Sequence, residues 1–205
     1  MKQLVVASSN PGKLRELSEL LAPLGIEIIP QTKLGIADAE EPHITFVENA
    51  LAKARHASLK TGLPAIADDS GLCVAALAGA PGVHSAHYAG RDGSREERDL
   101  RNNTKLVEDL RDAPDRSAYY YCVLVLVHTD DDPCPVIADG TWHGAIALEP
   151  RGTRGFGYDP HFLLTWRGLT AAELFPEEKN RVSHRARAMA ALEAKLTALS
   201  AHADD

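Results

Sequence analysis

The chain has 205 residues, of which 44% are hydrophobic and 25% are charged, and its formal net charge is −7 at pH 7. This size allows a full hydrophobic core, so we expect a single domain of two lobes over residues 1–205. The three cysteines are odd in number and lack CxxC spacing, so they indicate neither a disulfide framework nor a zinc site. The negative charge excludes broad nucleic-acid binding but leaves room for a local basic pocket that takes one small polyanion.

The N-terminal sequence and the hydropathy predict a soluble protein without a membrane partner. The chain enters a short apolar run directly, without a basic segment before it, and no apolar run approaches the roughly 20 residues that span a bilayer. Scattered thiols suit a reducing compartment. We therefore expect a cytoplasmic location.

The first elements are predicted to be a strand and a helix with a polar loop between them. Gln3 is followed by the apolar residues 4–7, and leucines recur at helical spacing from Leu14 onwards. The loop reads Ser8-Ser9-Asn10-Pro11-Gly12-Lys13. At a helix N-terminus, free N–H groups and the helix dipole attract a phosphate, and Lys13 adds a positive charge. The spacing GxxxxGK(S/T) is absent, which disfavours a P-loop NTPase, and a plain helix N-cap explains the same residues.

A second short strand is expected at residues 27–30, and an acidic loop containing Glu40 and Glu41 follows it. Lys53 lies on the helix after this loop and can point into the same cleft as Lys13. Taken singly, Glu40 and Glu41 are better explained as a surface loop and Lys53 as a solvated helix lysine.

The run from Ala65 to Gly71 predicts a buried strand that ends at Asp68 and Asp69. Successive side chains of a strand point to opposite faces, so we expect one carboxylate in a cleft and the other in a supporting shell. Unpaired carboxylates are costly there unless a cation, donors or water compensate them, and ligands bind at the carboxyl ends of strands in open α/β sheets. A strand that ends in an ordinary Asp-Ser-Gly turn is the alternative.

A second lobe is expected roughly at residues 80–150. Its predicted elements are a helix at residues 95–110 and two antiparallel strands at residues 117–128 and 135–148. The aspartates between these strands are interpreted as a solvated hairpin tip rather than a metal site. Leucines at helical spacing, including Leu100 here and Leu199 in the long C-terminal helix, are expected to face the core.

A glycine-dense loop at residues 152–160 carries Phe156, Tyr158 and Asp159. Glycines let a backbone approach a ligand closely, an aromatic ring can stack on a nucleobase, and a carboxylate can accept hydrogen bonds from it. These residues outline a base pocket, although a structural glycine loop explains them too. At the start of the last helix, His184 and Arg185 are placed for a polar ligand.

Together these motifs resemble the noncanonical purine nucleoside triphosphate pyrophosphatases, the XTP/dITP/ITP diphosphatases that include the inosine triphosphatases. The resemblance spans nearly the whole chain. It is carried by the following segments: Ser8 to Lys13, Glu40-Glu41 with residues 45–50 and 53–55, residues 67–71, residues 155–159, and residues 183–185. The departures are Ser8-Ser9 at the start of the first loop and Pro42-His43 after Glu41.

The resemblance implies an α/β fold of two lobes around a long mixed β-sheet with flanking helices, an active site in the cleft between the lobes, and a homodimer. It implies Mg²⁺-dependent hydrolysis of ITP, dITP and XTP to the nucleoside monophosphate and pyrophosphate. Asp69 is then the catalytic residue and, with Glu41, a metal ligand, while Glu40 and Asp68 are less favoured ligands. The implied substrate-binding residues are Ser8, Ser9, Asn10, Pro11, Gly12, Lys13, Lys53, Ser70, Phe156, Gly157, Tyr158, Asp159, Lys179, His184 and Arg185.

Two other functions stay open at this point. A Maf-like pyrophosphatase that acts on modified pyrimidine nucleotides has a similar architecture, but the Phe156 loop and the pair His184-Arg185 speak against it. A nucleotide-binding module without catalysis would keep the cationic residues and would not need Asp69.

Overall fold

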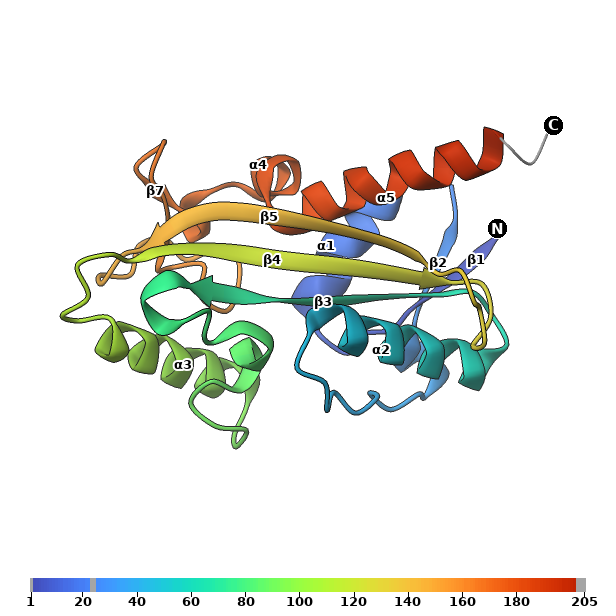
Figure 1. Ribbon diagram of the computed structural model, residues 1–205, viewed down its shortest axis with the longest axis horizontal. Coiled ribbons are helices and arrows are strands. Elements are labelled where there is room, and N and C mark those ends of the chain that lie inside the picture. Colours follow the sequence, from blue (N-terminus) through green and yellow to red (C-terminus); the bar gives the residue numbers. More distant parts are fainter. Residues whose placement is uncertain (1, 23–24, 202–205) are drawn as a thin grey trace. The chain divides into compact units, whose positions relative to one another are not determined.

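The structure, a computed structural model, describes residues 2–22 and 25–201 (Figure 1). The strands are β1 (Gln3–Val6), β2 (Glu27–Pro30), β3 (Ala65–Val74), β4 (Ser117–Val127), β5 (Val136–Ile146), β6 (Phe162–Leu164) and β7 (Leu169–Thr170). The α-helices are α1 (Pro11–Leu21), α2 (Phe46–Thr61), α3 (Arg95–Asp109), α4 (Pro176–Val182) and α5 (His184–Ala201). Short 3₁₀ helices are η2 (Gln31–Leu34), η3 (Ala75–Leu77), η4 (Gly82–His87) and η5 (Ala171–Glu173). Within residues 2–22 and 25–201, no helix has both the length and the hydropathy to cross a bilayer.

The strands form one seven-stranded sheet in the order β2-β1-β3-β4-β5-β6-β7. β1 pairs in parallel with β2 and β3, whereas β6 pairs antiparallel with β5 and β7. β4 and β5 run in opposite directions in Figure 1, as expected. The sheet is mixed, which confirms the predicted α/β fold class.

The chain divides into two compact units. The first unit comprises Met1–Asp69, Cys122–Gly140 and His184–Asp205, and the second comprises Ser70–Tyr121 and Thr141–Ser183. The second unit therefore shares residues 80–121 and 141–150 with the lobe expected at 80–150, whereas residues 122–140 belong to the first unit.

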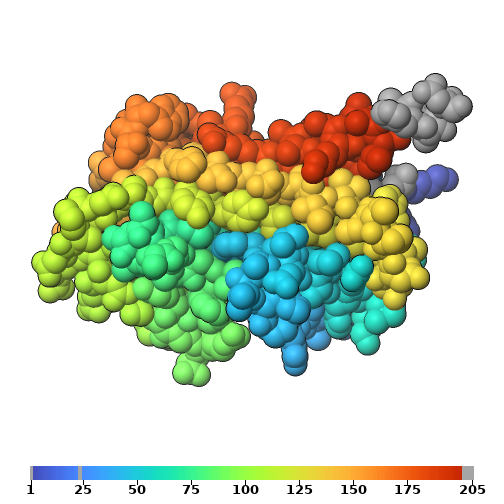
Figure 2. Space-filling view, in the orientation of Figure 1, coloured from blue at the N-terminus to red at the C-terminus, as the bar shows by residue number. Residues whose placement is uncertain are grey.

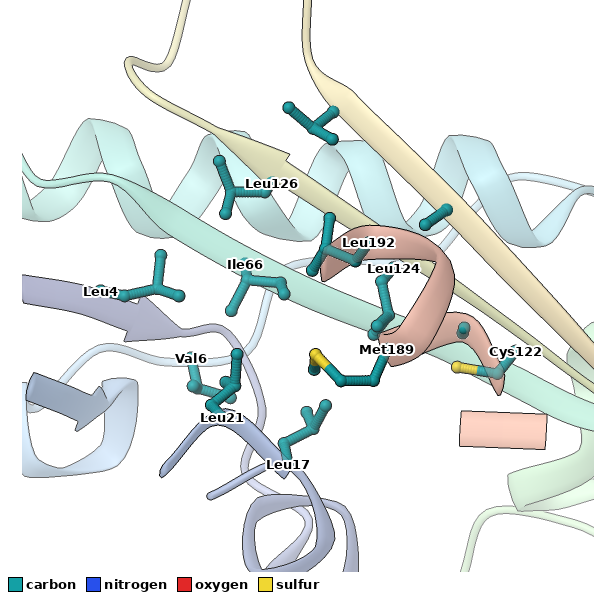
Figure 3. Packing of buried hydrophobic residues seen from close by; sticks show 13 residues of the cluster. Leu4, Val6, Leu17, Leu21, Ile66, Cys122, Leu124, Leu126, Met189 and Leu192 are labelled. Carbon is teal, nitrogen blue, oxygen red and sulfur yellow. The ribbon is translucent and has the colours of Figure 1, made fainter. Parts of the chain in front are cut away.

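The first unit has an aliphatic core. Leu4 of β1, Leu17 of α1, Leu124 of β4 and Leu192 of α5 are fully buried in it (Figure 3). Burying each such side chain contributes about 1.5–3 kcal/mol. A Cβ on Gly140 would collide with the main chain of α5, so glycine is what lets β5 approach this helix closely. These contacts pack α1 and α5 against the strands β1 and β4.

The second unit has an aromatic core instead. The Phe162 ring centroid lies 4.5 Å from that of Tyr120 and 5.2 Å from that of Trp142, in tilted arrangements that aromatic pairs prefer. Leu106 of α3 and Leu110, the residue that follows this helix, are buried in the same core. Residues of α3 and of the loop at residues 152–160 therefore share one hydrophobic core.

Two expectations about packing were wrong. Leu100 is 69% exposed, because it lies six positions before Leu106 and therefore on a different side of α3. Leu199 is 56% exposed at the wall of an open groove that Ile137 and Lys195 also line. The periodicity predicted both helices correctly, but it did not predict which of their leucines are buried.

The expectation that a strand ends at Asp68 and Asp69 was also wrong. β3 continues through Ser70 to Val74, so both carboxylates lie inside the strand. Cations from other segments reach both carboxylates and offset part of the cost of burying them within a sheet.

Candidate functional site

The loop after β1 caps α1. Ala7 N donates to Ile66 O, so the loop starts beside β3. Asn10 Oδ1 then accepts from Gly12 N at 3.0 Å and Lys13 N at 3.2 Å, with Pro11 in the first turn. This is the N-cap that the sequence indicated as an alternative, and it already occupies two of the free N–H groups. Of the features that predicted phosphate binding at this loop, the Lys13 ammonium and the helix dipole are left.

An acidic loop at residues 35–45 has no helix or strand and lies at the surface, in the blue part of Figure 2. Asp38 anchors it by accepting from the hydroxyl of Ser9 and, at 2.5 Å, from Gln31 Nε2. The sequence did not predict this hydrogen bond between the acidic loop and the loop after β1, because Asp38 belongs to no motif.

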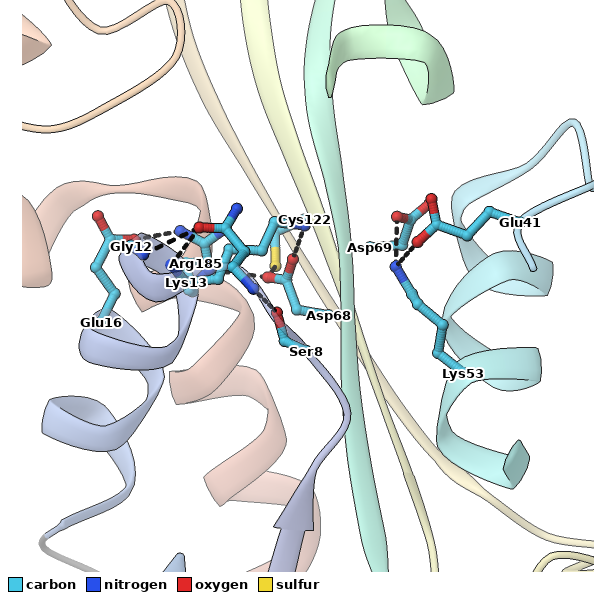
Figure 4. A network of polar contacts seen from close by, with 11 residues as sticks. Ser8, Gly12, Lys13, Glu16, Glu41, Lys53, Asp68, Asp69, Cys122 and Arg185 are labelled. Atoms are coloured by element: carbon cyan, nitrogen blue, oxygen red, sulfur yellow. Dashed lines mark hydrogen bonds and ion pairs between the residues drawn. The ribbon is translucent and has the colours of Figure 1, made fainter. Parts of the chain in front are cut away.

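On one face of β3, Asp68 is the centre of a buried ion network (Figure 4). Lys13 Nζ lies 2.6 Å from Asp68 Oδ1, and Arg185 Nε donates to Asp68 Oδ2 at 2.8 Å. Cys122 Sγ donates to the same oxygen at 3.0 Å, and Arg185 also pairs with Glu16. Burial alone would raise the pKa of Asp68, but the charges of Arg185 and Lys13 hold it well below the usual value. Asp68 is therefore an ionised anchor for both cations.

On the other face of β3, Asp69 and Glu41 share one lysine (Figure 4). Lys53 Nζ lies 2.8 Å from Asp69 Oδ1 and 2.7 Å from Glu41 Oε1. Burial raises the pKa of Asp69, and the nearby charges of Lys53 and Lys13 only partly oppose it. Among the described residues, the buried Asp69 Oδ2 has no hydrogen-bond donor.

This pair of carboxylates fits a Mg²⁺ ion. A buried carboxylate oxygen without a donor needs a cation or water beside it, and the Glu41 side chain remains 41% exposed. In the described part of the chain, no group of three or more His, Cys, Asp or Glu side chains lies close enough together to hold a metal ion by itself. Mg²⁺ usually takes one or two carboxylates from a protein and completes its shell with water and substrate phosphates. Asp68 suits the role less well, because its two oxygens already face Lys13 and Arg185.

In the second unit, Asp159 organises the glycine-dense loop. Asp159 Oδ2 accepts from Phe156 N at 3.0 Å and from Lys179 Nζ at 2.5 Å, and Tyr120 donates to Oδ1 at 3.3 Å. Gly155 has φ +77°, and a Cβ there would collide with the Asp159 carboxylate. The loop thus folds around the carboxylate that the sequence indicated as an acceptor for a base.

The structure distributes the predicted site residues over the two units. The first unit holds Ser8 to Lys13, Glu40, Glu41, Lys53, Asp68, Asp69, His184 and Arg185. The second holds Ser70, Phe156, Gly157, Tyr158, Asp159 and Lys179. Tyr158 is buried and donates to Ser85 O at 2.8 Å, and His184 is buried at the start of α5.

Sequence reasoning missed two polar partners of these residues. Glu16 pairs with Arg185, and its only sequence signal is that it shares a helix face with Lys13. Tyr120 faces Asp159 but reads as an ordinary strand residue, so no local pattern could have found it.

An α/β sheet that combines a helix N-terminus, buried lysines and ionised carboxylates is typical of proteins that bind phosphorylated small molecules. The chain belongs to the Ham1 family, whose model matches residues 4–195. This confirms the resemblance inferred from the motifs.

Similar proteins support this assignment. The chain is 62% identical to a dITP/XTP pyrophosphatase of Bordetella pertussis, over 97% of this chain and 92% of that protein. It is 63% identical to a dITP/XTP pyrophosphatase of Burkholderia pseudomallei, over 95% of this chain and 93% of that protein. Among solved structures, a HAM1 protein from Coxiella burnetii is similar with a TM-score of 0.87 and 51% identity, over 96% of this chain and 99% of that one.

Proposed function

We propose that the protein hydrolyses dITP, XTP and ITP to the nucleoside monophosphate and pyrophosphate. The observation that carries this proposal is the cluster of Asp69, Lys53 and Glu41, in which a buried carboxylate oxygen has no donor among the described residues. Relatives about 60% identical bear the name dITP/XTP pyrophosphatase, which supports this substrate class over modified pyrimidines and over binding without catalysis.

The phosphate chain is the first requirement. A triphosphate carries about four negative charges, which must be offset before a nucleophile can approach. Lys13 and Lys53 offer charge in the first unit, and Lys179 offers it in the second. Glu41 and Asp69 would hold Mg²⁺, which when bound offsets phosphate charge and makes a water molecule more acidic.

Asp69 is the proposed general base. The attacking water forms a bond to phosphorus, the bond to the pyrophosphate leaving group breaks, and the proton of the water passes to the Asp69 carboxylate. Without a metal, burial raises the pKa of Asp69, but a bound Mg²⁺ would lower it, so the metal would have to supply much of the acidity of the water. Lys53 holds Oδ1 of this carboxylate and so fixes its orientation.

Recognition of the base is the second requirement. We propose that Phe156 stacks on the purine, that Asp159 accepts from a ring N–H, and that His184 with Arg185 supplies donors to the C6 carbonyl. Adenine has an amino group at C6, so these donors would stay unpaired and ATP would be a poor substrate. Guanine keeps the carbonyl, so its rejection must come from its 2-amino group.

We further propose that the activity depends on Mg²⁺, that the protein forms a homodimer, and that it is located in the cytoplasm. The family resemblance is the support for dimerisation, and light scattering on the purified protein tests it directly. A mass corresponding to a single chain at micromolar concentration would contradict it.

One experiment tests the activity. The protein is incubated with Mg²⁺ and with ITP, dITP, XTP, GTP, ATP or a modified pyrimidine triphosphate, and the products are identified by chromatography. We expect equal amounts of monophosphate and pyrophosphate from ITP, dITP and XTP, and none when Mg²⁺ is chelated. Inorganic phosphate without pyrophosphate would overturn the proposed reaction, and no turnover of any nucleotide would favour a binding module.

A further inference from the structure

The loop that carries Phe156 contains two glycines with a left-handed backbone conformation. Gly155 has φ +77° and Gly157 has φ +63°, a region that residues with a Cβ rarely adopt. A Cβ on Gly157 would have no atom within 4 Å, so steric packing does not fix this residue. Hydrogen bonds rather than side-chain packing must therefore fix the position of Gly157.

Two side chains of α3 bind both main-chain polar groups of Gly157. Gly157 N donates to Asp99 Oδ2 at 3.0 Å, and Asn103 Nδ2 donates to Gly157 O at 2.9 Å. Asp99 and Asn103 are four residues apart, so they project from the same face of the helix. One side chain accepts from the N–H and the other donates to the carbonyl, as the main chain of a paired β-strand does.

A third residue of this helix face contacts the aromatic ring. The Arg95 guanidinium carbon lies 5.4 Å from the centroid of the Phe156 ring, which is within cation–π range. Its Nε lies 3.9 Å from Asp99 Oδ2. Burial raises the pKa of Asp99, although the Gly157 N–H and Arg95 act in the opposite direction. The Asp99 side chain is 23% exposed, so the carboxylate meets the loop in a partly buried position.

We propose that Asp99 and Asn103 are positioning residues that hold the Phe156 ring where it stacks on the nucleobase, so that α3 sets how tightly the base is bound. This inference rests on the proposed function. Neither residue would contact the substrate itself. Both would act through Gly157 on the neighbouring Phe156 ring.

The test measures binding without turnover. The affinity for inosine monophosphate is measured by calorimetry for the wild type, Asn103→Ala, Asp99→Ala, Phe156→Ala and the double variant Asn103→Ala/Phe156→Ala. Thr104→Ala is the matched control, because Thr104 is exposed on the same helix and its hydroxyl bonds only to Leu100 O within the described residues. Asp99→Asn is the conservative variant, since its side-chain oxygen still accepts from Gly157 N.

We expect Asn103→Ala and Asp99→Ala to weaken inosine monophosphate binding about tenfold, in the range that base–aromatic stacking supplies. Binding of pyrophosphate, which has no base, should stay within twofold of the wild type. Asp99→Asn should bind almost normally. The double variant should bind no more weakly than Phe156→Ala, because without the ring there is nothing left to position.

Each contrary result has a distinct meaning. Affinities equal to that of Thr104→Ala would overturn the positioning role, and so would additive losses in the double variant or equal losses for pyrophosphate. A wild type that binds inosine monophosphate but does not hydrolyse ITP would overturn the proposed function and leave the comparison of α3 variants intact. A wild type that binds no inosine monophosphate would overturn both.

Discussion

Asp68 and Asp69 are consecutive residues of β3, yet their carboxylates lie on opposite faces of the strand and bind different lysines (Figure 4). The pKa of Asp68 is lowered, because Arg185 and Lys13 outweigh the effect of its burial. The pKa of Asp69 is raised, because burial outweighs Lys53. Neighbouring carboxyls whose environments push their pKa values apart commonly divide the roles of fixed charge and proton acceptor.

Asp69→Asn should nearly abolish turnover and leave the fold intact. The substitution keeps the shape but removes the base and the metal ligand, so we expect a transition-state loss of about 3–5 kcal/mol in kcat/KM for ITP. Mg²⁺ should raise the unfolding temperature of the wild type and not that of this variant. If the variant kept a tenth of the wild-type rate, Asp69 would not be the base.

Asp68→Asn should show the opposite balance. We expect its turnover loss to be milder than that of Asp69→Asn. Its cost in the free energy of unfolding should be larger, about 3–5 kcal/mol, because Lys13 and Arg185 lose a buried counter-charge. Urea unfolding of both variants measures this. Equal turnover losses at both positions would mean that the two carboxylates act as a unit.

Much of the first unit could be predicted locally. The loop after β1, the cap of α1 and the opposed directions of Asp68 and Asp69 follow from periodicity and capping rules within a few residues. The continuation of β3 through Asp69 could not be predicted, because a strand tolerates buried carboxylates only when distant cations reach them. Arg185 lies 117 residues from Asp68, and no local pattern encodes that contact. The α3 contacts to Gly157 are hidden for the same reason.

Lys13→Ala and Lys53→Ala should impair use of every triphosphate alike. Phosphate charge is present in the ground state and in the transition state, so we expect kcat/KM to fall about 100-fold, shared between KM and kcat. Arg15→Ala on α1 and Lys60→Ala on α2 remove exposed charges from the same helices and serve as controls. The ratio of ITP to GTP activity should not change. A changed ratio in either lysine variant would show that this lysine senses the base rather than the phosphates.

Asp132 should stabilise the turn between β4 and β5 in a pH-dependent way. Its carboxylate accepts from the main-chain N–H groups of His128 at 2.9 Å and Cys134 at 2.8 Å, and these bonds lower its pKa. A carboxyl whose pKa is lower in the folded than in the unfolded protein stabilises the fold above its unfolded pKa, about 3.9. That contribution is lost as the pH falls through the folded pKa. Asp132→Asn should therefore cost about 1–2 kcal/mol in unfolding free energy at pH 7.

As the pH falls below about 4 the stabilities of the wild type and Asp132→Asn should draw together, and they should converge below the lowered folded-state pKa, where Asp132 is neutral as well. Urea unfolding at a series of pH values measures the difference at each pH. Asp131→Asn is the control, since Asp131 is exposed and accepts from the Thr129 hydroxyl rather than closing the turn. A difference between wild type and Asp132→Asn that stayed constant from pH 7 to pH 3 would show that the lost hydrogen bonds do not depend on the charge of Asp132.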